Sequence, residues 1–184
     1  MDDEATVAMR VDTIVIDPAS EMPVLVLRGE EQPEIYLPIF VGQLEAASIA
    51  SVLAEVELPR PMSHDLMIAL VDTLGGHLLY ITITNLHENT FYAEMMLAGA
   101  DGRERAVDAR PSDSIALAIR AGVPIYVTES VLASAGGISE PTDSGELPAV
   151  AEEQYSGEEE LAALLGQDAR LEDLAPELFG KYKM

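Results

Sequence analysis

The stretch from Asp108 to Gly122, D-A-R-P-S-D-S-I-A-L-A-I-R-A-G, restricts the fold more than any other part of the chain. Val107 continues a strand, and Pro111 suits the first turn of a helix, where its missing N–H costs nothing. The helix that follows is apolar nearly all round, so the fold must cover it on several sides. Gly122 can end this helix in the left-handed conformation. The sequence therefore predicts a strand that runs directly into a buried helix.

The order of hairpin, third strand and helix occurs twice along the chain. Ser48-Ile49-Ala50 and Ser114-Ile115-Ala116 are both S-I-A, 66 residues apart, and each lies in the predicted helix of its half. Hydrophobic periodicity and turn residues predict strands at 9–17, 23–28, 35–41, 78–86, 90–97, 103–109 and 124–127, and helices at 45–56, 63–74, 111–121 and 128–136. Pro38 suggests that the third strand lies at an edge or carries a bulge. The predicted fold is α+β: a duplicated hairpin-strand-helix unit forming a mixed, mostly antiparallel sheet with helices packed on it.

Four segments are expected. They are a disordered N-terminus (1–8), one domain (9–136), a flexible linker (137–157) and an acidic helical tail (158–184). The linker is rich in Pro, Gly, Ser and Glu, and the tail carries a stripe of leucines. Two roles for the tail stay open. It could dock on its own domain or on a neighbouring subunit, or it could compete with a polyanion for a basic pocket.

The net charge of −23 argues against a general nucleic-acid-binding surface. Lys occurs only at Lys181 and Lys183, and the other eight cations are Arg. The chain has no Cys and no apolar run of 18 residues, and it starts with acidic residues, the opposite of a signal peptide. These features predict a cytoplasmic protein with no membrane span.

Several catalytic motifs are absent from the sequence. No phosphate-binding P-loop, dinucleotide-binding glycine motif, H-E-x-x-H zinc motif or G-x-S-x-G nucleophile motif is present. A nuclease core with a catalytic Lys is excluded by the position of the two lysines. With only His77 and His87 besides His64, a multi-histidine metal site cannot be built. His64 is either a polar residue at a helix start or an acid–base group with the right intrinsic pKa.

Polar groups gather where the strand meets the buried helix: Asp108, Arg110, Ser112 and Asp113. They could be helix caps with a structural Arg–Asp pair, or they could form a binding site at a helix N-terminus. Four carboxylates are candidates for a site that binds a hard cation: Glu45, Asp65, Asp108 and Asp113. Magnesium needs only one or two of them, completed by water and phosphate oxygens. Arg60 and Arg110 could hold the phosphate.

Four separated motifs closely resemble those of the bifunctional nuclease family, as in a bacterial member. They are L-P-I-F-V-G (37–42) with Glu45-Ala46, R-P-M-S-H-D-L-M (60–67), T-F-Y-A-E (90–94) and D-A-R-P-S-D-S-I-A-L-A (108–118). The resemblance covers roughly residues 9 to 136. It implies cleavage of both DNA and RNA, a duplicated α+β sheet, and assembly into homo-oligomers.

The motifs mark the candidate residues, and the role given to each is a hypothesis from its chemistry. The catalytic candidates are His64, Asp65, Asp108 and Asp113; the phosphate-binding candidates are Arg60, Arg110, Ser112 and Tyr92; the metal candidates, for Mg²⁺ or Mn²⁺, are Glu45, Asp108 and Asp113. Two functions follow. The chain is a nuclease that hydrolyses phosphodiester bonds with a divalent cation, or it is a non-catalytic oligomeric module that binds a protein or a small phosphorylated ligand.

Overall fold

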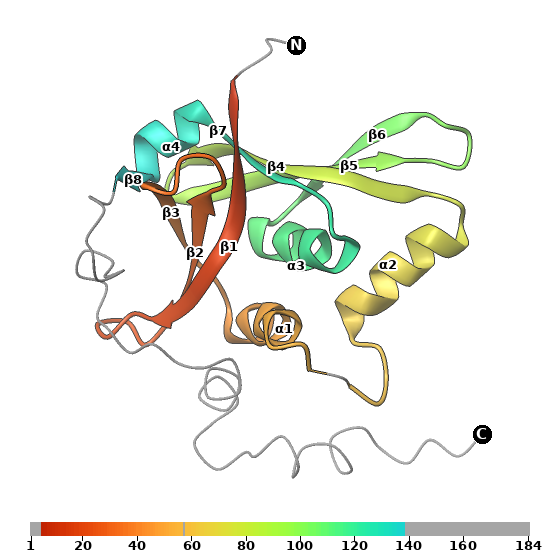
Figure 1. Ribbon diagram of the computed structural model, residues 1–184, viewed down its shortest axis with the longest axis horizontal. Coiled ribbons are helices and arrows are strands. Elements are labelled where there is room, and N and C mark those ends of the chain that lie inside the picture. Colours follow the sequence, from red (N-terminus) through yellow and green to blue (C-terminus); the bar gives the residue numbers. More distant parts are fainter. Residues whose placement is uncertain (1–4, 57, 139–184) are drawn as a thin grey trace.

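The computed structural model describes residues 5–56 and 58–138 (Figure 1). The predicted acidic tail and all of the predicted linker except Gly137 and Ile138 lie outside these residues. The described part contains four helices and one sheet of eight strands, which confirms the α+β class. The strands are β1 (Thr6–Ile16), β2 (Pro23–Gly29), β3 (Ile35–Phe40), β4 (His77–His87), β5 (Thr90–Ala98), β6 (Glu104–Ala109), β7 (Ile125–Thr128) and β8 (Gly137–Ile138). The helices are α1 (Gln43–Leu53), α2 (Ser63–Thr73), α3 (Pro111–Ala121) and α4 (Glu129–Ala135).

The sheet has the strand order β6-β5-β4-β7-β1-β2-β3-β8, with β7 between the two halves of the chain. All pairs are antiparallel except β4–β7, so the prediction of a mixed, mostly antiparallel sheet is confirmed. Because β7 is antiparallel to β1 and parallel to β4, the two three-stranded halves run in opposite directions. The duplicated order of elements in the sequence therefore appears as two meanders on either side of one central strand.

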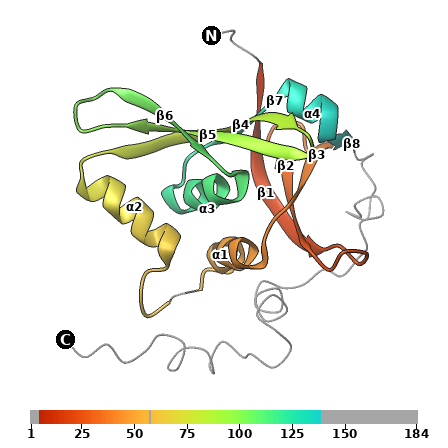
Figure 2. The ribbon, with the colours of Figure 1, turned by 180° about the vertical axis from the view of Figure 1, so that it is seen from behind.

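Figures 1 and 2 show α3 beneath β4 and β5, with α1 beside it and α2 on the outer flank. The middle of α3 is buried, including Ile115, Ala116 and Ala118, none of which is exposed to solvent. Ile49 and Ala50 of α1 are equally buried. The helix α3 is therefore covered on several sides, as its sequence predicts, and small side chains let α1 and α3 approach closely.

The predicted ends of α3 and the edge position of Pro38 are also confirmed. Pro111 is the first residue of α3, and Gly122 ends it with φ +65° in the left-handed region. Pro38 pairs with Val26 of β2, while β8 covers only Ile35 and Tyr36, so Pro38 lies on an open edge.

The first strand begins earlier than predicted. Residues Thr6, Val7 and Ala8 were expected in the disordered N-terminus, but they pair with β7. The pairing with β7, more than a hundred residues later, extends the strand to Thr6, and the carbonyl oxygen of Ala8 accepts the N–H of Glu30 at 3.0 Å.

One face of α2 remains apolar and exposed. Its exposed residues are Leu66, Met67, Leu70 and Leu74. They recur at the three- and four-residue spacing of a single helix face. An apolar helix face of this kind is typical of a surface that contacts another chain.

We expect Ile115→Ala to lower the free energy of unfolding by about 2–5 kcal/mol, because it leaves a cavity in a closed core. Leu44→Ala is the matched control, since Leu44 is 80% exposed and lies outside α2, and it should change stability by less than about 0.5 kcal/mol. Urea unfolding of both variants measures the difference. Equal stabilities would contradict the central position of α3.

Candidate active site

Arg110 joins the N-terminal ends of α1 and α3. It is the residue that caps α3, and its guanidinium donates two hydrogen bonds to Asp113, from Nε to Oδ2 (2.7 Å) and from Nη2 to Oδ1 (3.1 Å). Nη2 also donates to Oε1 of Glu45 (2.7 Å), in the first turn of α1. Gly42 permits this position of Glu45, because a Cβ at Gly42 would collide with the Glu45 carboxylate. The predicted Arg–Asp pair is present, and it is extended by a second carboxylate from the other half of the chain.

His64 lies between Asp113 and a serine of α1. Its Nδ1 is 2.9 Å from Oγ of Ser48, and its Nε2 is 3.3 Å from Oδ1 of Asp113. Because a carboxylate can only accept, Nε2 carries a proton in this arrangement. In the neutral imidazole, Nδ1 then accepts from the Ser48 hydroxyl. His64 is buried at the start of α2, so these two partners fix the plane and tautomer of its ring.

Arg120 continues the network beneath His64. Only 6% of its side chain is exposed, and its Nη2 donates to the carbonyl oxygen (3.0 Å) and to Oγ (3.1 Å) of Ser48. Its Nη1 donates to the carbonyl oxygen of Ala116 (2.9 Å), and its Nε donates to Oδ1 of Asp65 (2.6 Å). Ser48 therefore links His64 to Arg120, and the chain of contacts runs from Glu45 to Asp65 across three helices.

Asp65 has a second role at the start of α2. The helix begins at Ser63 with Met62 as its N-cap. The Oδ2 of Asp65 accepts the N–H of Met62 at 2.7 Å. The Asp65 carboxylate, in the first turn of the helix, thereby satisfies the backbone N–H of the N-cap residue.

Charge pairing lowers the pKa of both aspartates in the network. Burial alone would raise the pKa of Asp113, but the hydrogen bonds from Arg110 and His64 outweigh it. For Asp65, burial again opposes ionisation, and the hydrogen bonds from Arg120 and from the Met62 N–H outweigh it. The same pairing raises the pKa of Arg110, chiefly through Asp113 and then Glu45. Both carboxylates are therefore ionised at neutral pH.

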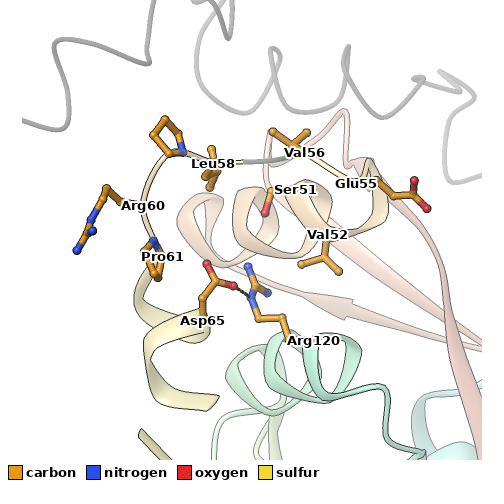
Figure 3. Close-up of a pocket in the computed structure, with 10 residues that line it drawn as sticks. Ser51, Val52, Glu55, Val56, Leu58, Arg60, Pro61, Asp65 and Arg120 are labelled. Carbon is orange, nitrogen blue, oxygen red and sulfur yellow. Dashed lines mark hydrogen bonds and ion pairs between the residues drawn. The ribbon is translucent and has the colours of Figure 1, made fainter. Parts of the chain in front are cut away.

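The predicted site residues separate into groups. The structure brings Glu45, His64, Asp65, Arg110 and Asp113 into one network, and Ser112 is buried in the same turn of α3. We refer to these side chains, together with Ser48 and Arg120, as the corner network. Arg60 lies in the connector between α1 and α2, on the rim of a pocket that reaches Asp65 and Arg120 (Figure 3).

Asp108 and Tyr92 lie outside the corner network. Asp108 pairs with Glu94 of β5, and directly opposed residues in an antiparallel pair share one face of the sheet. Phe91, Ala93 and Met95 of β5 point toward the core, so alternation places Tyr92, Glu94 and Asp108 on the opposite face. In the described part of the chain, the Asp108 carboxylate has no hydrogen bond or ion pair. The predicted catalytic role of Asp108 and the phosphate-binding role of Tyr92 stay predictions.

The fit of a divalent cation can be judged from the positions of the carboxylates. Glu45 and Asp113 both bind the Arg110 guanidinium, and Asp108 is on another face of the sheet. Within residues 5–56 and 58–138, no group of three or more His, Asp or Glu side chains is placed to hold a metal ion. As arranged, the three predicted metal ligands do not form one site.

Sequence reasoning missed Ser48 and Arg120 as members of the site. Ser48 was noticed only as part of the repeated S-I-A, and Arg120 was not singled out. The available signal was a charged residue in a helix that is otherwise apolar all round, because a buried Arg must have partners. Those partners lie 55 and 72 residues away in the chain.

No helix among the described residues is long and apolar enough to cross a bilayer.

Comparison with known proteins identifies related sequences. The chain matches the bifunctional nuclease domain family over residues 25–140. An uncharacterized protein of Mycobacterium tuberculosis is 48% identical over 128 residues, which make up 70% of this chain and 75% of that protein. Bifunctional nuclease 2 of Oryza sativa subsp. japonica is 28% identical over 123 residues, 66% of this chain and 38% of that protein. Bifunctional nuclease 1 of Arabidopsis thaliana is 27% identical over 116 residues, 62% of this chain and 36% of that protein. The match therefore spans little more than a third of each plant nuclease.

We expect Asp65→Asn to lower the free energy of unfolding at pH 7 by about 1–2 kcal/mol, because the buried Arg120 loses its ionised partner. A fully buried pair would cost more, about 3–5 kcal/mol, but the Asp65 side chain is 38% exposed. The folded-state pKa of Asp65 is below the ordinary 3.8, so its contribution is present above pH 3.8 and is lost as the pH falls through the folded value.

Urea unfolding at pH 7, 5 and 3 checks this prediction. The difference between the native chain and the variant should be constant from pH 7 to 5 and smaller at pH 3. A difference that grows at low pH would contradict it.

Proposed function

This chain belongs to the bifunctional nuclease domain family, and on that premise we propose that it is a nuclease that hydrolyses phosphodiester bonds of RNA and DNA at the corner network. The family membership expected from the four sequence motifs is confirmed by the match over residues 25–140. The plant relatives carry the name bifunctional nuclease, which supports a nuclease-related role. The cleavage activity itself and both substrates are the proposed part.

The observation that supports this site best is that one carboxylate oxygen joins an exposed guanidinium to an ordered imidazole. Oδ1 of Asp113 accepts from Nη2 of Arg110 and also lies 3.3 Å from Nε2 of His64. The Arg110 side chain is 66% exposed, and its Nη1 makes no hydrogen bond within the described residues. Two N–H groups of Nη1 are therefore available for a phosphate oxygen beside a titratable group.

In the proposed reaction, Arg110 binds a non-bridging phosphate oxygen and stabilises the charge that develops as water attacks phosphorus. The bond from phosphorus to the leaving oxygen breaks, that oxygen takes the proton carried by Nε2 of His64, and the proton lost by the attacking water returns to the imidazole. Asp113 orients the imidazole through its contact with Nε2. Ser48 and Arg120 are positioning residues, because they hold His64 and touch no substrate atom.

The predicted requirement for Mg²⁺ or Mn²⁺ remains a proposal to be tested by assay. The carboxylates that were expected to bind the ion are held by Arg110, so no step is routed through a metal.

A non-catalytic module is the second candidate function. It is favoured by the pairing of every charged group in the corner network with another member of that network, as in a purely structural set of caps and salt bridges. It is also favoured by the net charge of −23, which opposes approach of a polyanion. In this case the network would join α1, α2 and α3 and perform no chemistry.

We also propose that the chain forms homo-oligomers through the exposed apolar face of α2. Leu70→Lys places a charge in the middle of that face and should convert an oligomer into monomer, as measured by light scattering after size-exclusion chromatography. Val107→Lys, which charges an exposed apolar residue on β6 instead, is the control and should leave the mass unchanged. A native chain that is already monomeric would contradict the proposal.

We expect His64→Ala and Arg110→Ala each to lower the rate of cleavage of labelled single-stranded RNA and DNA by about 10²-fold or more. Arg103→Ala removes an arginine that is 82% exposed and lies at the opposite end of β6 from Arg110, and it should retain full activity. Each protein is assayed with Mg²⁺, with Mn²⁺ and with a chelator, and its folding is checked by thermal melting.

Cleavage that survives in folded His64→Ala and Arg110→Ala variants would place the active centre elsewhere or indicate a contaminating enzyme. No cleavage by the native chain under any of the three conditions would favour the non-catalytic module. Cleavage that continues in the chelator would show that the reaction needs no divalent ion.

A further inference from the structure

A pocket of about 450 Å³ lies next to the corner network, between α1, the connector to α2, and the C-terminal end of α3. This volume is within the range of about 300–1,000 Å³ that is typical of small-molecule sites. Its apolar lining includes Val52 of α1 and Leu58 and Pro61 of the connector. Figure 3 shows Asp65 and Arg120 side by side at its base. The pocket thus combines aliphatic walls with a polar pair at its base, and Ser51, Glu55 and Arg60 also line it.

The base of the pocket offers a pair of hydrogen-bond acceptors. Oδ1 of Asp65 accepts one hydrogen bond from Arg120, and Oδ2 accepts one from the N–H of Met62. A carboxylate oxygen can accept two hydrogen bonds, so each oxygen retains capacity for one more. Arg120 also keeps one donor, because its five N–H groups make four hydrogen bonds within the described residues.

Arg60 belongs to the connector that lines the pocket, and within the described residues its charge is unpaired. Each of the other arginines within residues 5–56 and 58–138 lies within 4.0 Å of a carboxylate oxygen. Arg60 has no ion pair or hydrogen bond in this part of the chain, and Figure 3 shows its side chain at the outer side of the connector. In a strongly acidic protein, an uncompensated arginine beside a pocket favours an anionic group at that point.

These three features fit a nucleotide, whose flat base can lie between aliphatic walls while its phosphate stays at the mouth. Among the four common bases, guanine alone presents two N–H donors on neighbouring atoms, N1 and N2. A carboxylate with one free acceptor site on each oxygen matches that pair, whereas adenine, cytosine and uracil offer a single donor position to it.

We propose that this pocket binds one guanine nucleotide of the substrate strand, with Asp65 accepting from N1–H and N2–H of the base and Arg60 contacting its phosphate. The proposal rests on the proposed nuclease function for the origin of the nucleotide, and it names a preferred base for the same site. Ser48 connects the two regions, because it contacts both Arg120 at the pocket base and His64 in the corner network.

Binding is tested without cleavage by calorimetric titration of the full chain with the 5′-monophosphates of guanosine, adenosine, cytidine and uridine, and with guanosine alone. The guanine nucleotide should bind at least about 10-fold more tightly than each of the other three. Arg60→Ala should weaken binding of guanosine monophosphate by about 10-fold and leave guanosine unchanged. Arg103→Ala is the matched control and should alter neither affinity.

Two variants close the pocket from opposite walls. Val52→Trp and Leu58→Trp should each reduce binding of guanosine monophosphate by more than about 30-fold. Thermal melting identifies a variant that has lost its fold. The affinity of the other, folded variant for guanosine monophosphate then tests the proposal. Equal affinity for all four nucleotides, no binding at millimolar concentration, or unchanged binding in a folded Trp variant would each overturn the proposal.

Cleavage and binding can fail separately. A chain that cleaves RNA or DNA but shows no preference for guanosine monophosphate would overturn the pocket assignment and leave the nuclease function standing. A chain that binds guanosine monophosphate with the expected preference but cleaves neither polymer would support the pocket and overturn the nuclease function.

Discussion

The buried guanidinium of Arg120 holds the arrangement of the helices together. It is bound to Ser48 on α1, to Asp65 on α2 and to the backbone of its own helix α3. An arginine in this position would be costly without these partners, because an unpaired charge in an apolar interior is strongly destabilising. The need to pair this buried charge therefore fixes the position of each partner. The position of His64 follows, since its ring rests on the hydroxyl that Arg120 also contacts.

The duplicated fold carries a single site rather than two. At the 66-residue offset of the repeat, Arg110, Asp113 and Arg120 correspond to Leu44, Ala47 and Ala54. The serines are kept in both halves, but their partners differ. Ser48 contacts His64 and Arg120, while Ser114 donates to the carbonyl oxygen of Arg110. The two halves thus share their packing, and the charges of the corner network come mainly from the second half and from α2.

The distribution of charge limits how this protein could approach a polyanion. Almost every arginine in the described residues is paired with a carboxylate, which removes long-range attraction and leaves short-range hydrogen bonding. Arg110 keeps free N–H groups at the surface, and Arg60 has no carboxylate partner among the described residues. Recognition by such a surface depends on a few local contacts rather than on a basic face. Its dependence on salt should therefore be weaker than that of a protein which neutralises many phosphates.

The sequence by itself determined the class of fold, the order of its elements and the character of α3. The local signals are apolar residues all round the helix, Pro at its start and Gly at its end. They can be recognised without knowledge of the rest of the chain. The sequence also identified Arg110, Asp113 and His64 as candidates, because their residue types carry the relevant chemistry. Only the tertiary structure decided which of the candidates meet. Asp108 precedes Arg110 by two residues, yet strand register turns its side chain to the opposite face of the sheet. Arg120 contacts Asp65 and Ser48, which lie 55 and 72 residues away in the chain. Contacts over such separations are set by packing between helices, and no local sequence pattern indicates them.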